Sequence, residues 1–221
     1  MSENRPFISV CYAQSVDGCI AARNNHPLTL SGHESMVFTH RLRTSFDAIL
    51  VGIGTVLADN PRLNARLVEG PDPQPIVLDT HLRVPVDSAL LQQNPKRSWI
   101  SCGKDRSTER KDRLEAAGAD ILECETGADR RIDLPVLMQR LLKKGVGSIM
   151  VEGGAQVITS FINHQLVDQL IVTIAPKLVG GLPVVDQRGI SAKPFLPLDQ
   201  IEYQRIGDDM ILWACPQWST I

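Results

Sequence analysis

The segment from Asp47 to Arg66 constrains the fold more than any other part of the chain. It opens with an apolar run at 48–51, whose length and composition are typical of a buried strand. The run ends at Gly52 and Gly54, and polar residues then follow. Glycine at a strand end lets the backbone approach a ligand closely, and open α/β sheets bind ligands beyond the carboxyl ends of their strands. The segment therefore predicts one wall of a binding site.

A second segment of the chain has the same design. The apolar residues 149–151 lead into Glu152, Gly153, Gly154 and Ala155, and a helical pattern follows. Backbone N–H groups at such a helix start can bind a phosphate, although the glycines would equally allow tight packing of strand against helix. Because both segments end in glycine and carry acidic residues, we expect them to form two walls of one site.

Length, composition and charge exclude several classes of function. The chain has 221 residues, of which 43% are hydrophobic and 22% charged, as in an ordinary soluble globular protein, and we expect a single domain over residues 1–221. A net charge of −2 gives no support for a nucleic-acid partner. There is no apolar run long enough for a membrane span and no secretory signal pattern. The five scattered cysteines have no metal-ligand spacing, so we expect reduced thiols, a cytoplasmic location and no metal.

Hydrophobic spacing and turn residues predict the order of the elements. Strands are expected over 7–12, 47–51, 75–78, 98–101, 119–122, 148–152, 170–175, 201–206 and 210–215, with a short return at 19–22. Helices are expected over 32–44, 107–117, 134–142 and 157–162, and irregular structure over 60–75 and 79–97. Ser31 and Glu34 form a capping-box pattern at the start of the first helix.

This order predicts an α/β fold. Strands alternate with helices through the middle of the chain, and a hairpin closes it, which indicates a sandwich with a mostly parallel sheet and antiparallel additions at one edge. The strand at 170–175 is the longest unbroken apolar strand candidate. In a monomer it would risk an exposed sheet edge or face, so we expect a homodimer to cover it.

Polar side chains near the two glycine segments suggest binding chemistry. Arg62, Asn64 and Arg66 lie in one loop and suit an anionic ligand, although a solvated loop is the alternative. Arg43 could reach a phosphate or only complement its helix dipole. A carboxylate at Glu152 would need a donor if it enters a site.

The cofactor signal is weaker. Gly52 and Gly54 begin a dinucleotide fingerprint, but Leu57 replaces its third glycine, so a tight turn is an equal interpretation. There is no catalytic triad order and no phosphate-loop lysine. The five histidines, His40 among them, have no metal spacing and are expected at the surface or in packing. A reaction with neither nucleophile nor metal favours hydride transfer.

At this point a series of ordered motifs resembles one known family. The motifs are Ser15-Val16-Asp17-Gly18, Leu28-Thr29-Leu30-Ser31, His40-Arg41-Leu42-Arg43, Ile49 to Pro61, Leu63 with Arg66, Val77-Leu78-Asp79 with Arg83-Val84-Pro85, Val151-Glu152-Gly153-Gly154, Leu166-Val167-Asp168, Ala175-Pro176-Lys177 and Gly180-Gly181. The chain resembles the riboflavin-biosynthesis reductases, which include the C-terminal domain of the bifunctional bacterial deaminase/reductase and the stand-alone archaeal and fungal enzymes. It departs from their pattern at Cys19, Asn60 and Gln169, and it lacks the deaminase zinc motif.

The resemblance implies a dihydrofolate-reductase-like three-layer sandwich, NADPH as cofactor and a homodimer. It implies reduction of the ribosylamino side chain of a pyrimidine 5′-phosphate to ribitylamino. Substrate contacts would fall on Arg43, Leu63, Arg66 and Glu152, and cofactor contacts on Ala13, Thr29, Thr55, Asp59, Gly153, Gly154 and Ala155.

The mechanism expected from this resemblance is direct hydride transfer from the nicotinamide to C1′ of the opened ribose. Glu152 is the catalytic candidate, and Asp17 could be a general acid or could equally fix a turn. Gly52 and Gly54 would face the cofactor, while Ser101 and Lys104 could receive its 2′-phosphate. Two alternatives stay open: a reductase of the same fold for another pterin-like or pyrimidine substrate, and a non-catalytic nucleotide-binding module. The sequence leaves open whether the substrate ring is a diaminopyrimidinone or a uracil.

Overall fold

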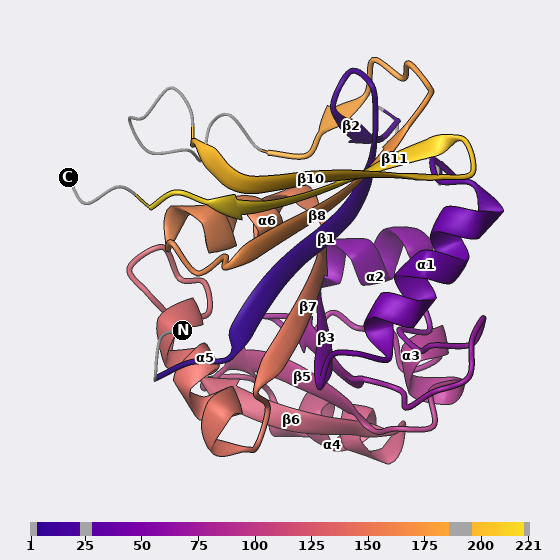
Figure 1. The fold of residues 1–221 in the computed structure, drawn as a ribbon. Helices are drawn as coiled ribbons and strands as arrows, with labels where there is room; N and C mark the ends of the chain where they lie inside the picture. The colour runs from indigo at the N-terminus through magenta and orange to yellow at the C-terminus, as the bar shows by residue number, and fades with distance from the viewer. Residues whose placement is uncertain (1–3, 23–27, 186–195, 219–221) are drawn as a thin grey trace.

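A computed structural model describes residues 4–22, 28–185 and 196–218 of the chain. In this part of the chain, nine strands form one sheet in the order β10-β11-β8-β1-β7-β3-β4-β5-β6, and β2 pairs with β9 in a separate ribbon (Figure 1). The described helices include none that is both long and apolar enough to cross a bilayer.

The strands and helices have the following bounds. The strands are β1 Phe7–Ser15, β2 Cys19–Ala21, β3 Ala48–Gly52, β4 Gln74–Leu78, β5 Ser98–Gly103, β6 Ala119–Cys124, β7 Ser148–Gly153, β8 Gln169–Ala175, β9 Leu182–Pro183, β10 Leu198–Ile206 and β11 Asp209–Pro216. The helices are α1 His33–Arg43, α2 Ile53–Asp59, α3 Ala89–Gln92, α4 Thr108–Ala116, α5 Leu134–Lys143 and α6 Ala155–Asn163.

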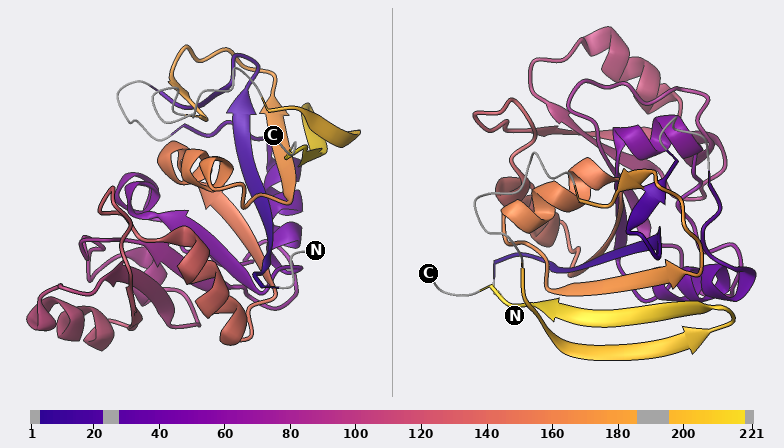
Figure 2. Two further views of the ribbon diagram at one scale, coloured as in Figure 1. Left: turned by 90° about the vertical axis from the view of Figure 1, so that its left-hand side faces the viewer. Right: turned by 90° about the horizontal axis from the view of Figure 1, so that it is seen from above.

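Most of the large sheet is parallel, as the sequence predicts. Neighbouring strands from β8 through β1, β7, β3, β4 and β5 to β6 all run in the same direction. Strand β11 pairs antiparallel with β8 and with β10. The predicted C-terminal hairpin therefore forms the antiparallel addition at one margin of the sheet, where it is drawn in yellow (Figure 2).

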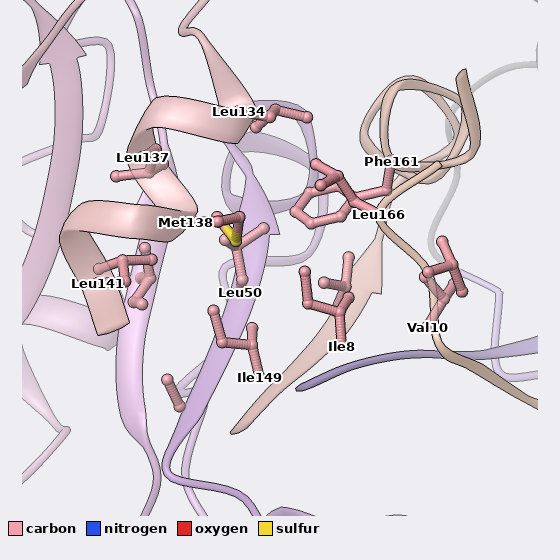
Figure 3. Packing of buried hydrophobic residues seen from close by; sticks show 14 of the residues in the cluster. Ile8, Val10, Leu50, Leu134, Leu137, Met138, Leu141, Ile149, Phe161 and Leu166 are labelled. Atoms are coloured by element: carbon pink, nitrogen blue, oxygen red, sulfur yellow. The ribbon is translucent and has the colours of Figure 1, made fainter. Parts of the chain in front are cut away.

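Helices cover both faces of this sheet and make three layers. On one face, α5 and α6 pack on the inner strands through a cluster that includes Met138 and Phe161 (Figure 3). On the other face, α2, α3 and α4 share a cluster with Ile49 and Val51, and Phe38 of α1 packs on a third cluster. Alternate side chains of the buried β3 thus enter opposite cores, as a strand's two-residue period requires.

Three details of the sequence interpretation are wrong. Ser31 does not cap α1: Gly32 is the N-cap without a side-chain bond, and Asp209 Oδ2 accepts the Gly32 N–H at 2.8 Å instead. The region at 79–97 contains the short helix α3. Strand β8 is no sheet edge, because β1 and β11 flank it, and the edges are β10 and β6.

The carboxyl ends of four adjacent strands form one row. Gly153 of β7 pairs with Val51, next to Gly52 of β3. Leu78 of β4 pairs both with Gly52 and with Ser101 of β5. At about 4.8 Å per strand, the row from β7 to β5 is about 14 Å long. The predicted cofactor residues of three different strands therefore line the same edge of the sheet.

The two glycines of the first segment have different surroundings. A Cβ added at Gly52 would lie 2.6 Å from Cγ2 of Val157, so this glycine lets α6 pack on β3. A Cβ added at Gly54 would have no atom within 4 Å. Gly52 therefore has a packing role that the sequence did not predict for it, whereas the space at Gly54 is open.

This difference predicts opposite effects on stability. Gly52→Ala should lower the free energy of unfolding by about 1–3 kcal/mol, because the added methyl overpacks the contact with Val157. Gly54→Ala is the matched control and should leave stability unchanged or raise it by up to about 1 kcal/mol, since alanine favours a helix. Urea denaturation of both variants measures their free energies of unfolding, and equal values for the two variants would contradict the prediction.

Candidate active site

An ion pair between Arg43 and Glu152 lies at the centre of the candidate site. Arg43 is the last residue of α1, and Glu152 is the penultimate residue of β7. The guanidinium donates from Nε to Oε1 and from Nη2 to Oε2 of the carboxylate, both at 2.7 Å. The two side chains are only 11% and 15% exposed. This bidentate geometry is the strong form of a charge-assisted hydrogen bond, and it fixes the helix end to the strand end.

The pair supplies the donor that the sequence required for a carboxylate at Glu152. Burial disfavours the charged form of Arg43, but the attraction and hydrogen bonds of Glu152 outweigh burial and raise the pKa of the arginine. Arg43 therefore stays cationic although it is buried. The carboxylate has the donor that its position required, and Arg43 does more than complement a helix dipole.

The polar loop after α2 joins this pair. Arg43 Nη1 donates to the backbone oxygen of Asn64 at 2.8 Å, and Asp72 Oδ1 accepts the N–H of Ala65. Arg66 is exposed and makes one long contact of 3.4 Å, to Asn64 Oδ1. Burial, then Arg43 and Arg62, lower the pKa of Arg66, against the attraction of Glu152. Arg66 is thus available to a ligand, whereas Arg43 is engaged by Glu152 and Asn64.

Leu63 has a structural side chain. It is 1% exposed within the second core cluster and has a φ of +55°. Its side chain packs against the protein, so a ligand could meet only its backbone. The predicted substrate contact at this position is therefore restricted to main-chain groups.

His40 lies one turn before Arg43 on α1 and is 5% exposed. Burial first, then the charges of Arg43 and Arg66, lower the pKa of the imidazole to about 4, while Glu152 and Asp72 oppose that shift. The ring is therefore neutral at pH 7. His40 is buried, which is one of the two positions that the sequence predicted for the histidines. The charged groups of the site, and not only apolar residues, are its neighbours.

The second glycine segment begins α6 beside the first. Gly153 has a φ of +113°, which favours glycine, and the bond between Gly153 and Gly154 is cis. Gly154 is the N-cap of α6 and has no side-chain cap. A Cβ at Gly154 would lie 3.4 Å from Oγ1 of Thr55 in α2. The structure thus brings the two predicted walls together at Thr55 and the Gly153–Gly154 turn.

The other predicted cofactor residues lie on β5, β1 and α2 and on the segment that Lys177 binds. Ser101 is buried at the β5 end of the strand row, and the exposed Lys104 after it pairs with Glu125. Ala13 lies in β1 opposite Thr173, and Asp59 is the exposed last residue of α2. The oxygen of Thr29 accepts a hydrogen bond from Lys177 Nζ at 2.9 Å.

Asp17 fixes a turn. Its carboxylate accepts hydrogen bonds from the Ser15 hydroxyl at 2.5 Å, from Gly180 N at 2.7 Å and from Val179 N at 3.0 Å. These bonds, with Ser15 first, lower the pKa of Asp17 well below its usual range. An ionised carboxylate with three donors has no proton to give, so the turn alternative is the one that this geometry favours. The described residues contain no group of three potential metal ligands.

The family model described as the RibD C-terminal domain matches residues 6–212. The chain belongs to the RibD C-terminal domain family. It is 33% identical to the 2,5-diamino-6-ribosylamino-4(3H)-pyrimidinone 5′-phosphate reductase of Archaeoglobus fulgidus over 95% of this chain and 98% of that protein. It is 33% identical to the riboflavin biosynthesis protein RibD of Actinobacillus pleuropneumoniae over 80% of this chain, but spans only 47% of that longer protein.

Solved structures of riboflavin-biosynthesis proteins and of a dihydrofolate reductase have a similar fold. The Rib7 riboflavin biosynthesis reductase of Saccharomyces cerevisiae has a TM-score of 0.78 and 27% identity, covering 98% of this chain and 92% of that one. RibD of Acinetobacter baumannii has a TM-score of 0.83 at 23% identity, covering 98% and 59%. A dihydrofolate reductase of Enterococcus faecalis complexed with NADP(H) has a TM-score of 0.51 at 14% identity, covering 96% of each chain. The predicted dihydrofolate-reductase-like sandwich is confirmed.

The sequence did not predict how several residues support the site. Asn64, expected in an anion-binding loop, accepts from Arg43 through its backbone oxygen, and Lys177 binds the backbone of the Thr29 segment from 148 residues away. Asp209 caps α1 from the C-terminal hairpin. The Ala175-Pro176-Lys177 motif was a signal for Lys177, but no local pattern pairs Asp209 with α1, because that contact exists only in the folded sheet.

The Arg43–Glu152 pair predicts a loss of stability when its charge is removed. Glu152→Gln should lower the free energy of unfolding by about 1–3 kcal/mol, because a hydrogen-bonded arginine then lacks its anion. Glu125→Gln is the matched control: its pair with Lys104 is more than half exposed and should contribute little. Denaturant unfolding of both variants at pH 7.5 is the measurement. A Glu152 variant as stable as the wild type would show that the pair does not support the fold.

The lowered pKa of His40 predicts acid sensitivity. Between pH 6.5 and about 4 the unfolded chain protonates this imidazole while the folded chain leaves it neutral. The unfolded state then binds more protons, so stability falls as the pH falls through this window. The wild type should therefore lose more unfolding free energy between pH 7 and 4.5 than His40→Gln. His81→Gln, at an exposed position, should keep the wild-type dependence, and an unchanged slope in the His40 variant would refute the assignment.

Proposed function

We propose that this chain is an NADPH-dependent reductase of riboflavin biosynthesis. It would reduce the ribosylamino side chain of a pyrimidine 5′-phosphate to ribitylamino by direct hydride transfer. The observation that carries the proposal is the Arg43–Glu152 pair beside Arg66, on the strand that leads directly into the Gly153–Gly154 turn. The carboxylate of Glu152 and the guanidinium of Arg66, which can bind an anion, lie beside a glycine turn of the kind that binds dinucleotides. The Archaeoglobus relative is named as a reductase of this kind.

The residues present fit a dinucleotide. The first amides of α6 have no side-chain cap, so they can donate to a pyrophosphate. Gly54 has open space where a side chain would be, and Thr55 faces Gly154. The strand row from Gly153 to Ser101 is about 14 Å long, which suits an extended ligand. A bound NADPH supplies the hydride.

The chain's own residues bind and orient the substrate. The ion pair with Arg43 fixes the position of Glu152, whose oxygens can also accept a hydrogen bond from an amino group of the pyrimidine. Arg66 offers a guanidinium to the phosphate. Rate enhancement then comes from positioning and electrostatics rather than from a protein nucleophile. No proton donor is assigned, since Asp17 is ionised and occupied by its turn.

Turnover of the proposed substrate tests this function. The diaminopyrimidinone and uracil forms of the ribosylamino 5′-phosphate should be assayed side by side with NADPH. We expect measurable reduction of at least one form and a 10- to 1,000-fold lower kcat/KM in Glu152→Gln. The NADPH Kd should change far less, because backbone groups hold the cofactor. If neither form is reduced, the chain acts on a different substrate or binds a nucleotide without chemistry. If the Glu152→Gln variant melts early but reduces the substrate at the normal rate, Glu152 is a structural residue.

We also predict a preference for NADPH over NADH. The turn after β5 carries Lys104 and Arg106, and Arg106 Nε is buried without a partner among the described residues. Arg106→Gln should narrow the ratio of kcat/KM between the two cofactors, whereas Arg205→Gln, on the exposed hairpin, should not. NADH kinetics equal to those of NADPH in the wild type would refute this preference.

We further propose a homodimer, whose interface lies on a different strand from the one that the sequence predicted. Strand β8 is covered by β11, whereas β10 is an edge strand among the described residues, and its Ile201 and Tyr203 are 48% and 65% exposed. An exposed edge with apolar side chains favours pairing with another copy. Light scattering at micromolar concentration should give twice the chain mass; a monomer mass would reject the dimer.

The organisation of the chain is part of the same proposal. The sheet takes β1 from one end of the chain and β11 from the other, which supports one reductase domain over residues 1–221. The five cysteines form no disulfide. Free thiols fit a reducing compartment, and we propose the cytoplasm.

A further inference from the structure

The side chain of Asn94 connects the segment after α3 to the loop that carries Arg66. Its Nδ2 donates to the backbone oxygen of Arg62 at 2.7 Å and to that of Leu63 at 3.3 Å. Its Oδ1 accepts the N–H of Lys96 at 2.9 Å, which fixes the orientation of the amide. Both ends of this half-buried side chain are therefore in use, although no local sequence pattern pairs it with the loop.

The backbone of Leu63 has a conformation that leucine rarely adopts. Its φ is +55°, in the left-handed region that disfavours a side chain. A residue persists in this region only where its surroundings hold it there. The buried leucine side chain is one anchor. The other is Asn94, which binds the two carbonyl groups on either side of the Leu63 Cα.

Further bonds fix the loop before and after this point. Before it, Asn60 Oδ1 accepts the N–H of Ala89, the first residue of α3, at 2.7 Å. After it, Arg43 and Asp72 bind the backbone of residues 64 and 65. The loop is therefore tied to α3 and the segment after it on one side and to α1 on the other.

The position of Arg66 depends on these anchors. Arg66 comes directly after the last anchored residue of the loop, and its guanidinium makes one long contact of 3.4 Å, to Asn64 Oδ1. The side chain is exposed, so it has no strong anchor of its own. The backbone of the loop therefore determines where the charge of Arg66 can meet a ligand.

We propose that Asn94 is a positioning residue for the anion contact of Arg66. Asn94 touches neither substrate nor cofactor. It holds the loop backbone in the conformation from which Arg66 meets the phosphate of the substrate. The identity of that ligand rests on the proposed function, whereas the effect of Asn94 on the loop does not.

Hydrogen exchange of the ligand-free protein tests the hold of Asn94 on the loop. Asn94→Asp keeps the volume but replaces the donor by a carboxylate, which only accepts and repels both carbonyl oxygens. Asn94→Ala removes the amide without adding a charge. Peptides over residues 61–66 should exchange about 10-fold faster in Asn94→Asp and less so in Asn94→Ala, while β3 and β7 exchange as in the wild type.

Gln92→Glu is the matched control for Asn94→Asp. It also replaces an amide donor by a carboxylate, because Gln92 Nε2 donates to the backbone oxygen of Val86 at 2.9 Å. It lies two residues away and adds the same charge, but this bond does not involve the loop. Exchange over residues 61–66 and KM should therefore stay at the wild-type values.

Kinetics separate positioning from a general loss of stability. With the phosphorylated ribosylamino substrate, Asn94→Asp should raise KM about 5- to 10-fold and leave kcat and the NADPH Kd within about threefold. Arg66→Gln should raise KM about 10-fold or more. Adding Asn94→Asp to Arg66→Gln should raise KM by less than about twofold further, because the contact that Asn94 positions is already lost. A purely structural role would multiply the two effects.

Three results would overturn this role of Asn94. They are exchange over residues 61–66 in Asn94→Asp equal to that in Gln92→Glu, an unchanged KM in Asn94→Asp, and multiplied effects in the double variant. In all three cases the proposed function stands as long as the wild type reduces the substrate.

If the wild type reduces neither form of the substrate, the proposed function fails and inorganic phosphate becomes the probe. Calorimetric titration should then show weaker phosphate binding in Asn94→Asp and in Arg66→Gln, with no further loss in the double variant, and this result supports the role of Asn94. Absent binding in the wild type, or losses that multiply, would reject it.

Discussion

The bidentate pair between Arg43 and Glu152 is the interaction on which the candidate site depends. It joins a helix end to a strand end, and a third bond from the same guanidinium fixes the loop at Asn64. An ion pair with so little exposure stabilises mainly when every donor and acceptor is satisfied, and here the geometry satisfies both carboxylate oxygens. The pair therefore determines where Arg66 and His40 lie, because both belong to elements that it connects.

The sheet provides the second constraint. Its strands from β8 to β6 are parallel, so their carboxyl ends meet at one end of the sheet. The helices that follow β3 and β7 pack on opposite faces. Because these helices diverge, the ends of the strands are accessible while the backbone hydrogen bonds of the sheet are kept. Other open α/β sheets bind ligands at the same place, beyond the carboxyl ends of their strands. Gly52 allows α6 to pack closely on β3, whereas a side chain at Gly54 would enter open space. One short glycine segment thus combines packing and access.

Most of the fold could be predicted from sequence, but the partners within the site could not. The period of Leu134 to Leu142 fixes α5, and the unbroken apolar run at 48–51 fixes β3, since both patterns are local. Arg43 and Glu152 are 109 residues apart, and the cap of α1 comes from Asp209, 177 residues from Gly32. Local signals such as Ser31 with Glu34 describe what a helix end can use, whereas the folded sheet decides which group reaches it.

The strand order has a consequence for how the protein is made. Strand β7 lies between β1 and β3, yet it is synthesised after β6, when both of its neighbours have long left the ribosome. A nascent chain that ends before Ser148 therefore has two unpaired strand edges where the centre of the sheet will form. Such edges are templates for wrong pairing between chains, and closing non-local parallel pairs is slow. The carboxylate of the site is on β7 itself, so the site cannot be complete before this strand has joined β1 and β3.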